Sequence, residues 1–324
     1  MNNVFVTRPI PQNALDHLRR EATVEVWPGP LPPPYEELRR RVATCDGLLC
    51  LLTDRVDATL IASAPKLRVI SQMAVGYDNI DVAAATSRGI PVGHTPGVLT
   101  EATADLTWAL ILATARRVVE GMRFIDAGQW QTWDPLGLLG MELHGATLGI
   151  LGLGRIGAAV ARRAVGFGMR LLYTGPREKP DVAAGVGAIY TDVDTLLHES
   201  DVVSIHCPLT PATRHLINAH ALARMKPGAI LVNTARGGIV DHAALLDALR
   251  SGHLGGAGLD VTEPEPLPAD HPLMGEDRVI ITPHIGSATV RTRARMADMA
   301  VSNLLAGLRG DPLPHCVNPD VYTR

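Results

Sequence analysis

The chain has few cysteines and no long apolar run. Its four cysteines form no C-x-x-C pair, and such spacing fits neither a disulfide framework nor a zinc site. We therefore expect a reducing, cytoplasmic environment and no metal site. The most apolar run covers residues 106–115, and Asp105 and Arg116 flank it. Because this run is only half as long as a membrane span, it predicts a buried helix.

An excess of charge of either sign is also absent. The 324 residues carry a formal net charge of −3, which argues against nucleic acid or an anionic membrane as a partner. The N-terminal segment MNNVFVTRPIPQ holds no apolar signal core, so we expect no export. Hydrophobic residues make up 46% and charged residues 19% of the chain. This balance is ordinary for a soluble globular protein, and the length predicts about two domains.

Short apolar segments alternate with helical patterns along the chain, which is typical of α/β folds with parallel sheets. We expect two doubly wound domains, one from each of two such series. The expected strands cover residues 3–8, 47–52, 67–72, 90–95, 146–152, 171–175, 201–208, 229–235, 257–261 and 279–285. The expected helices include residues 13–22, 35–43, 82–88, 100–124 and 288–308, and Gly310 is expected to end the last one.

Three glycines, Gly152, Gly154 and Gly157, form a G-x-G-x-x-G motif between an apolar strand and an amphipathic helix. In that context the motif is the fingerprint of a dinucleotide-binding Rossmann fold. Gly152 permits the tight turn, Gly154 lets the backbone approach a pyrophosphate, and Gly157 lets the helix pack on the sheet. The helix N-terminus would supply free N–H groups to the phosphates. The alternative is a glycine-rich turn that binds no ligand.

The end of the next strand lacks the acidic residue that would bind the ribose hydroxyls of NAD. Gly175 stands there, eighteen residues after Gly157. It does not repel the 2′-phosphate of NADP, and Thr174 and Arg177 can donate hydrogen bonds to that phosphate. The sequence therefore favours NADP(H). NAD(H) remains possible if Arg177 is only a solvated loop residue.

Three polar residues lie at or just past the ends of strand patterns in the second series: Arg236 follows AILVNTA, Glu265 follows AGLDV, and His284 follows VIITP. Open α/β sheets bind ligands beyond the carboxyl ends of their strands, so all three can converge. Arg236 can grip a carboxylate, His284 can exchange a proton near neutral pH, and Glu265 can orient the imidazole. A structural histidine and an exposed acidic loop are the alternatives for His284 and Glu265 taken singly.

Longer motifs accompany these residues in the order AVGYDNID (74–81), LGLGRIG (151–157), HCPLTPATRHLIN (206–218), MKPGAILVNTARGGIVD (225–241), GLDVTEPEPL (258–267) and ITPHIGSAT (281–289). On these residues the chain resembles the D-isomer-specific 2-hydroxyacid dehydrogenases over nearly its whole length. Within that family it is most similar to the glyoxylate/hydroxypyruvate reductases. The resemblance implies a Rossmann cofactor domain, residues 99–289, inserted in a flavodoxin-like substrate domain, residues 1–98 plus 290–324, with the active site between them.

The resemblance also implies a role for each matched residue. Arg236 would bind the substrate carboxylate and keto oxygen, and His284 would donate the proton with Glu265 as its partner. The N–H groups of Val75 and Gly76 would hold the same carboxylate. The further cofactor contacts would be Thr103, Arg155, Ile156, Pro208, Thr213, Thr234, Ala235, Asp260, His284 and Gly286. A loop-capping role is the alternative for Asp260, and a turn role is the alternative for Thr213.

Two residues carry interpretations that the sequence leaves open. In the resembling reductases the segment around Trp133 reaches across a homodimer, so Trp133 would border the partner subunit's substrate site. It is otherwise an interface anchor of the 99–145 region. Ser287 would hydrogen-bond the hydroxyl of hydroxypyruvate or, alternatively, cap a helix.

Together these features predict NADPH-dependent reduction of a small 2-oxo acid to a D-2-hydroxy acid. Glyoxylate would give glycolate, and hydroxypyruvate would give D-glycerate. The alternatives are another D-2-hydroxyacid dehydrogenase, a phosphite dehydrogenase, or a non-catalytic NAD(P)-sensing protein of the kind that serves as a corepressor on this scaffold.

Overall fold

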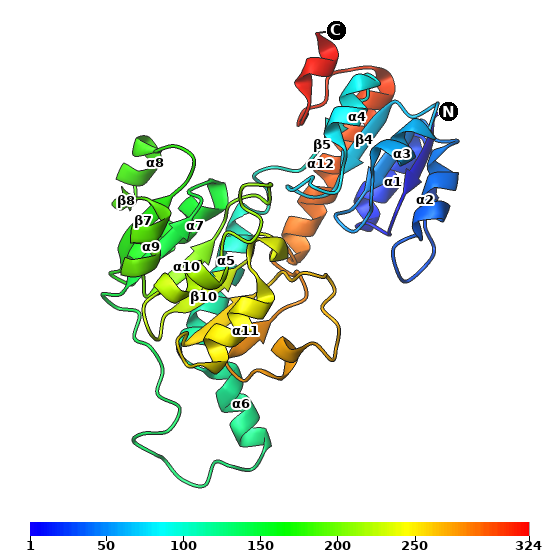
Figure 1. Ribbon diagram of the computed structural model, residues 1–324. Helices are drawn as coiled ribbons and strands as arrows, with labels where there is room; N and C mark the ends of the chain where they lie inside the picture. The colour runs from blue at the N-terminus through cyan, green and yellow to red at the C-terminus, as the bar shows by residue number, and fades with distance from the viewer. Residues whose placement is uncertain (324) are drawn as a thin grey trace. The chain divides into compact units, whose positions relative to one another are not determined.

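The computed structural model describes residues 1–323, and Figure 1 follows the chain from one terminus to the other. The chain forms two compact units, one of Met1–Leu99 with Ala288–Arg324 and one of Thr100–Ser287. Each unit contains its own parallel sheet. The predicted fold class, α/β with two parallel-sheet domains, is therefore confirmed.

In the first unit, five described strands form a sheet in the order β2-β1-β3-β4-β5, the order of flavodoxin-like folds. The strands are β1 (Asn3–Val6), β2 (Thr23–Val26), β3 (Gly47–Cys50), β4 (Val69–Gln72) and β5 (Val92–Gly93). The helices are α1 (Gln12–Glu21), α2 (Tyr35–Val42), α3 (Ala58–Ala62), α4 (Val82–Ser87), α12 (Val290–Arg309) and the 3-10 helix η3 (Pro319–Tyr322).

The strands β3 and β4 are buried along their whole length, as expected for parallel strands that helices cover on both faces. Helix α12, orange in Figure 1, packs against both strands and against α1. The side chain of Thr289 caps its N-terminus by accepting a hydrogen bond from the N–H of Thr292. The helix ends at Gly310, whose φ of 85° suits only glycine without strain. The expected end at Gly310 is confirmed.

In the second unit, seven described strands form a sheet in the order β12-β11-β10-β9-β6-β7-β8. The strands are β6 (Thr147–Leu151), β7 (Arg170–Thr174), β8 (Ala188–Tyr190), β9 (Val202–Ile205), β10 (Ile230–Asn233), β11 (Gly256–Leu259) and β12 (Val279–Ile281). The helices are α5 (Thr100–Ala115), α6 (Val118–Asp126), α7 (Arg155–Val165), α8 (Pro180–Ala184), α9 (Val193–Glu199), α10 (Ala219–Arg224), α11 (His242–Arg250), and the 3-10 helices η1 (Gly237–Ile239) and η2 (Pro272–Gly275).

The strand order of this second sheet reverses between the paired strands β6 and β9. In open α/β sheets the ligand crevice lies at such a reversal, beyond the carboxyl ends of the strands. All strands of the sheet run parallel, so the loops after β6, β7, β9, β10, β11 and β12 leave from one edge. This edge carries the predicted cofactor and catalytic residues.

The single helix expected over residues 100–124 is wrong, because two helices, α5 and α6, occupy this region. The chain breaks at Arg117, which has a left-handed φ of 51°. The carbonyl oxygen of Ala115 accepts a hydrogen bond from the N–H of Met141 at 2.7 Å. A Cβ at Gly140 would collide with that same oxygen. Residues 140–141 therefore pack against the end of α5 and satisfy its Ala115 carbonyl. The local sequence of the helix does not reveal this contact.

The apolar run at 106–115 lies within α5, whose Leu110 and Ile111 are buried against β10, β11 and α7. The predicted buried helix is confirmed. Within residues 1–323, no helix combines the length and the hydropathy that a membrane crossing requires.

Candidate active site

The glycine loop joins β6 to α7 at the reversal of strand order. Gly152 has a φ of 101°, and a Cβ there would lie 2.8 Å from the backbone nitrogen of Cys207 in the loop after β9. A Cβ at Gly157 would collide with the carbonyl oxygen of Gly152. Gly154, in contrast, has open space on that side and precedes the first turn of α7. The loop therefore combines two close backbone contacts with one open approach, as a pyrophosphate site needs.

The first turn of α7 is open to an anion. Arg155, its first residue, is exposed, whereas Ile156 packs partly against the core of this unit. The N–H groups of Arg155, Ile156 and Gly157 donate to no acceptor within residues 1–323. Such free N–H groups and the partial positive charge of the helix end favour a phosphate.

The loop after β7 lies beside the glycine loop. Thr174, the last residue of β7, is nearly buried, and its carbonyl oxygen accepts a hydrogen bond from the N–H of Gly152 at 3.0 Å. Arg177 and Glu178 are exposed. No carboxylate stands at position 175, whose carbonyl oxygen accepts a hydrogen bond from the Tyr190 hydroxyl at 2.9 Å. Arg177 is thus open to solvent near the carboxyl end of β7.

Sequence reasoning did not assign a role to Lys179, the second cation of this loop. Its ammonium group donates a hydrogen bond to the carbonyl oxygen of Leu153, between the first two motif glycines, at 3.1 Å. Its N–H donates to the hydroxyl of Tyr173 at 2.9 Å. Lys179 therefore ties the loop after β7 to the glycine loop and brings a positive charge next to that loop. Only the fold, which pairs β6 with β7, reveals this contact.

His284 and Glu265 meet from the loops after β12 and β11. The Nδ1 atom of His284 lies 2.5 Å from Oε1 of Glu265. Burial acts to raise the pKa of Glu265, but the hydrogen bond and charge of His284, with smaller effects of the Thr262 N–H and Arg236, together outweigh it, and the pKa lies below its ordinary value. Glu265 is therefore ionised at neutral pH and accepts a hydrogen bond from the Nδ1–H group of His284. The opposite ring nitrogen, Nε2, is left for proton exchange.

Arg236 stands at the end of β10 beside this pair. Its carbonyl oxygen accepts a hydrogen bond from the side-chain amide of Asn233 at 2.8 Å, and Asn233 is fully buried. The side chain is half-buried, and Nη1 donates to the carbonyl oxygen of Ala235 at 2.8 Å. The positive charge of Arg236 also lowers the pKa of Glu265, although less than the contacts with His284 do. The fold thus brings the three residues into one electrostatic neighbourhood.

Asp260 shapes the loop that carries His284. Its carboxylate, 1% exposed, accepts hydrogen bonds from the Thr282 hydroxyl at 2.6 Å and from the N–H groups of Ile285 and Gly286 at 2.8 and 2.7 Å. Its carbonyl oxygen accepts from the N–H of His284 at 2.9 Å. His284 itself has a left-handed φ of 55°, a conformation that costs energy for a residue other than glycine. These contacts hold it there, as the loop-capping alternative for Asp260 supposes.

Other predicted cofactor residues gather at the same edge. A Cβ at Gly286 would lie 3.1 Å from Oδ2 of Asp260 and 3.3 Å from Cγ2 of Thr103, so these three residues adjoin. Thr107 links Thr103 to β10, because its hydroxyl donates to the Thr103 carbonyl at 2.8 Å and lies 2.9 Å from the Thr234 hydroxyl. Helix α5 therefore approaches the ends of β10 and β12, next to Ala235.

Pro208 and Thr213 lie in the loop after β9. The Thr213 hydroxyl donates to the carbonyl oxygen of Pro208 at 2.7 Å and accepts from the N–H of Thr210 at 2.8 Å. The hydroxyl thus closes a turn, as the turn alternative for Thr213 supposes. This turn lies on the β9 side of the crevice.

Ser287 does not cap a helix, so that alternative is wrong. Helix α12 begins at Val290, and Thr289 occupies the capping position. Ser287 lies too far ahead of the first turn for its hydroxyl to replace the Thr289 cap. Ser287 directly follows Gly286, which adjoins Asp260 and Thr103.

Trp133 lies in the segment that follows α6, and its side chain is 79% exposed. The same region exposes further large apolar side chains, namely Met122, Ile125, Trp130, Leu136 and Leu139. Monomeric soluble proteins rarely expose so many apolar side chains in one stretch, and such clusters mark contact sites.

In the first unit, the loop after β4 carries Val75 and Gly76. Their N–H groups donate to no acceptor within residues 1–323, and both residues are half-buried. Their carbonyl oxygens are each hydrogen-bonded, to Nδ1 of His94 at 3.0 Å and to Nε2 of Gln72 at 3.1 Å. Successive free N–H groups on a fixed backbone favour an anion.

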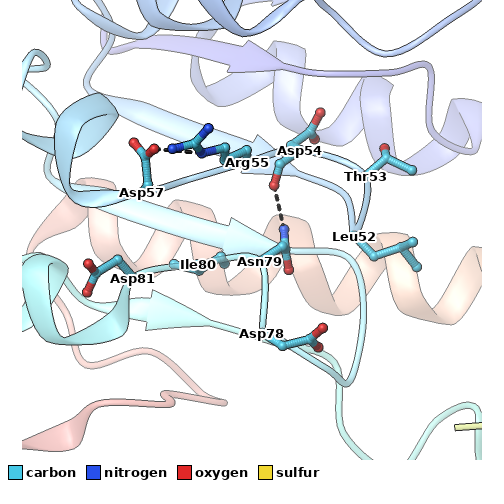
Figure 2. Close-up of a pocket in the computed structure, with 9 residues that line it drawn as sticks. All are labelled: Leu52, Thr53, Asp54, Arg55, Asp57, Asp78, Asn79, Ile80 and Asp81. Atoms are coloured by element: carbon cyan, nitrogen blue, oxygen red, sulfur yellow. Dashed lines mark hydrogen bonds and ion pairs between the residues drawn. The ribbon is translucent and has the colours of Figure 1, made fainter. Parts of the chain in front are cut away.

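A separate pocket of about 380 Å³ opens between the loops after β3 and β4 (Figure 2). Asn79 ties the two loops together by donating to the carbonyl oxygen of Asp54 at 2.8 Å, and Arg55 pairs with Asp57 at 2.7 Å. The lining residues are Leu52, Thr53, Asp54, Arg55, Asp57, Asp78, Asn79, Ile80 and Asp81. Because four of them are acidic and one is basic, this pocket does not suit an anionic substrate.

The described part of the chain contains no cluster of three or more His, Cys, Asp or Glu side chains arranged to hold a metal ion.

Comparisons with known proteins agree with this arrangement. Residues 108–286 match the family model of the D-isomer specific 2-hydroxyacid dehydrogenase NAD binding domain. The chain is 52% identical over 322 residues to a glyoxylate reductase of Aeropyrum pernix, covering 98% of this chain and 96% of that protein. A solved structure of a Thermus thermophilus protein, 54% identical, has a TM-score of 0.91 and covers 97% of this chain and 99% of its own.

A second solved structure, a glyoxylate reductase from Paecilomyes thermophila, is 33% identical, with a TM-score of 0.87 and 98% of each chain covered. The family model spans the glycine loop and the loops of Arg236, Glu265 and His284. The similarity to these relatives extends over almost the whole chain, across both units. The chain therefore belongs to the D-isomer specific 2-hydroxyacid dehydrogenase family and is an NAD(P)-dependent oxidoreductase.

Proposed function

We propose that this protein reduces a small 2-oxo acid, glyoxylate or hydroxypyruvate, with NADPH as its preferred cofactor. The products would be glycolate and D-glycerate. The proposal rests on the 2.5 Å contact between His284 and Glu265 within electrostatic reach of Arg236. The curated relative in Aeropyrum pernix, named glyoxylate reductase, supports the choice of substrate. In this proposal the second unit binds the cofactor and the first binds the substrate carboxylate.

The protein's part in the reaction is to supply the proton. When bound, the reduced nicotinamide supplies the hydride that the carbonyl carbon receives. His284 gives its Nε2 proton to the carbonyl oxygen, so that the C=O group becomes CH–OH, and it recovers a proton from solvent afterwards. The ionised Glu265 favours the charged imidazole and fixes the ring through Nδ1. Arg236 stabilises the negative charge that grows on the oxygen before the proton arrives.

We propose that the substrate carboxylate is bound by Arg236 and by the N–H groups of Val75 and Gly76. The planar guanidinium suits a carboxylate, and the two N–H groups lack other partners in the described chain. Ser287 would hydrogen-bond the hydroxyl of hydroxypyruvate, since it directly follows Gly286, which adjoins Asp260.

The cofactor would lie along the crevice of the second sheet. Its pyrophosphate would bind Gly152, Gly154, Gly157 and the N–H groups of Arg155 and Ile156. The residues proposed near the nicotinamide are Thr103, Thr234, Ala235, Asp260, His284 and Gly286, and those on the adenosine side are Pro208 and Thr213. The buried carboxylate of Asp260 would favour the cationic ring that forms on hydride loss.

The preference for NADPH rests on the loop after β7. An acid at position 175 would repel the 2′-phosphate, and glycine removes that repulsion. The phosphate would bind Thr174 and Arg177, and Lys179 adds a second positive charge close by, 3.1 Å from the glycine loop carbonyl. NAD(H) would bind more weakly, because it lacks the group that these cations attract.

We further propose that the protein is a cytoplasmic homodimer. Residues 99–145 would form the interface, since the exposed apolar side chains gather there. Trp133 would border the substrate site of the partner subunit.

A steady-state panel tests the proposal. NADPH and NADH are each combined with glyoxylate, hydroxypyruvate, pyruvate and phenylpyruvate. We expect the highest kcat/KM for NADPH with glyoxylate or hydroxypyruvate, and a D-configured glycerate from hydroxypyruvate. Turnover of phosphite with NAD, or cofactor binding without any turnover, would contradict the proposal and favour a phosphite dehydrogenase or a dinucleotide sensor.

A further inference from the structure

Three successive carbonyl groups of the loop after β4 are each held by a hydrogen bond. The oxygen of Ala74 accepts from the N–H of Thr95 at 2.8 Å. The oxygen of Val75 accepts from Nδ1 of His94 at 3.0 Å, and that of Gly76 from Nε2 of Gln72 at 3.1 Å. Three successive peptide groups of this loop are therefore fixed in orientation.

Each of these bonds also sets the direction of one N–H group. A peptide unit is planar and trans, so the carbonyl of one residue and the N–H of the next point in opposite directions. The bond to Ala74 therefore aims the N–H of Val75, and the bond from His94 aims the N–H of Gly76. Glycine has no side chain to restrain its backbone, so the His94 bond is the main restraint on the Gly76 N–H.

His94 is itself held in place from two sides. Its carbonyl oxygen accepts a hydrogen bond from the side-chain amide of Asn303 in α12 at 2.9 Å, and Asn303 is fully buried. A Cβ at the preceding Gly93 would lie 2.7 Å from Cβ of Asn303, so glycine there permits this approach. The ring of Tyr77 meets the imidazole edge-on, with centroids 5.7 Å apart.

The other end of the loop is anchored independently. Gln72 is fully buried, and its amide donates to the side-chain oxygen of Asn79 at 2.6 Å as well as to the Gly76 carbonyl. Asn79 donates in turn to the carbonyl oxygens of Leu51 and Asp54 at 3.1 and 2.8 Å. The loop can therefore keep its overall position when His94 is changed, while the Val75–Gly76 peptide loses its restraint.

We propose that His94 is a positioning residue for substrate recognition, because its Nδ1–H aims the Gly76 N–H at the substrate carboxylate. This inference rests on the proposed role of Val75 and Gly76 in carboxylate binding. His94 does not touch the substrate in this proposal. It sets the affinity for the 2-oxo acid and leaves cofactor binding and proton transfer, which depend on the second unit, unchanged.

Two substitutions separate this role from general packing. His94→Phe keeps an aromatic ring against Tyr77 but has no donor. His94→Asn loses the ring but retains a donor nitrogen on Cγ, at the place of Nδ1. His253→Phe is the matched control, since Nε2 of His253 also contacts a backbone carbonyl, that of Leu222, at 3.1 Å outside the proposed site.

The readouts are KM and kcat for glyoxylate with NADPH, the dissociation constant of NADPH, and the dissociation constant of oxalate for the NADPH complex. For His94→Phe we expect KM and the oxalate constant to rise about tenfold, the effect of misplacing one hydrogen bond to a charged group. We expect kcat and the NADPH constant to stay within about twofold in His94→Phe, and all four constants to do so in His94→Asn and His253→Phe.

The outcomes distinguish this inference from the proposed function. An unchanged KM and oxalate constant in His94→Phe, beside an active wild-type enzyme, overturns the positioning role alone. A wild-type protein that reduces no 2-oxo acid, but whose oxalate binding weakens in His94→Phe, overturns the reductase proposal and keeps the positioning role. Equal rises of KM and the oxalate constant in His94→Phe and His94→Asn overturn the positioning role, since they indicate a packing role. A loss of kcat and of NADPH binding in His94→Phe overturns it for the same reason.

Discussion

Replacement of Glu265 by glutamine should move the pH dependence of reduction without abolishing the reaction. The carboxylate of Glu265 lies 2.5 Å from Nδ1 of His284 and has a lowered pKa, so it is ionised throughout the neutral range. Its negative charge favours the protonated imidazole, which is the form that donates the proton. Glutamine keeps one hydrogen-bonding oxygen of the same size, replaces the other with an amide nitrogen and removes the charge.

The size of the shift follows from the contact. A hydrogen bond to a charged group contributes about 1.5–3 kcal/mol, and one pH unit corresponds to about 1.4 kcal/mol. The Glu265 side chain is 35% exposed, and solvent screening places the effect at the lower end. We therefore expect the alkaline limb of kcat/KM for reduction to move down by about one pH unit. Activity well below the limb should change little.

The assay is the pH profile of kcat/KM for glyoxylate with NADPH, measured for both proteins in buffers of constant ionic strength. Glu199→Gln is the control, since Glu199 forms an exposed ion pair with Arg170 at 2.7 Å. Equal thermal melting of the three proteins excludes a folding defect. An alkaline limb that stays in place in Glu265→Gln, or one that moves to higher pH, would refute the reasoning.

The remaining predictions concern the cofactor, the substrate and the interface. Gly175→Asp should lower the kcat/KM ratio of NADPH to NADH at least tenfold, because a carboxylate would repel the 2′-phosphate; an unchanged ratio would remove that explanation. Gly152→Ala should abolish NADPH binding in a fluorescence titration, since the φ of 101° at Gly152 and the Cys207 backbone leave no room for a methyl group; tight binding by the variant would contradict the proposed pyrophosphate site at the glycine loop. Arg236→Lys should reduce kcat/KM for glyoxylate about a hundredfold with NADPH binding retained, because an ammonium group cannot make the paired hydrogen bonds that the planar guanidinium makes to a carboxylate. Trp133→Glu should weaken a dimer in sedimentation experiments, and a monomeric wild-type protein would refute the proposed interface.

Local motifs made part of the site predictable. The glycine motif carries its own geometric demand, and the positive φ of Gly152 and the close packing of Gly157 follow directly from it. The alternation of apolar strands and helices was enough to place Arg236, Glu265 and His284 after strands of one parallel sheet. Parallel strands end at a common edge, so their convergence needs only the sheet order.

Contacts between distant segments account for what the sequence did not show. The helix break at Arg117 depends on Met141, and the restraint on His284 depends on Asp260, 24 positions earlier in the chain. The strands β2 and β8, at the sheet edges, were not among the expected strands. They are short and partly exposed, so they lack the apolar run that marks a central strand. The bonds of His94 and Lys179 to backbone carbonyls likewise require the fold.

The proton donor is the central claim, and His284→Ala tests it most directly. Initial rates of NADPH oxidation with saturating glyoxylate are compared for the wild-type and variant proteins, with NADPH binding measured in parallel. We expect the variant to bind NADPH as the wild type does and to lose at least a hundredfold in kcat, the usual contribution of a positioned acid. Near wild-type turnover in the variant would contradict the assignment of His284.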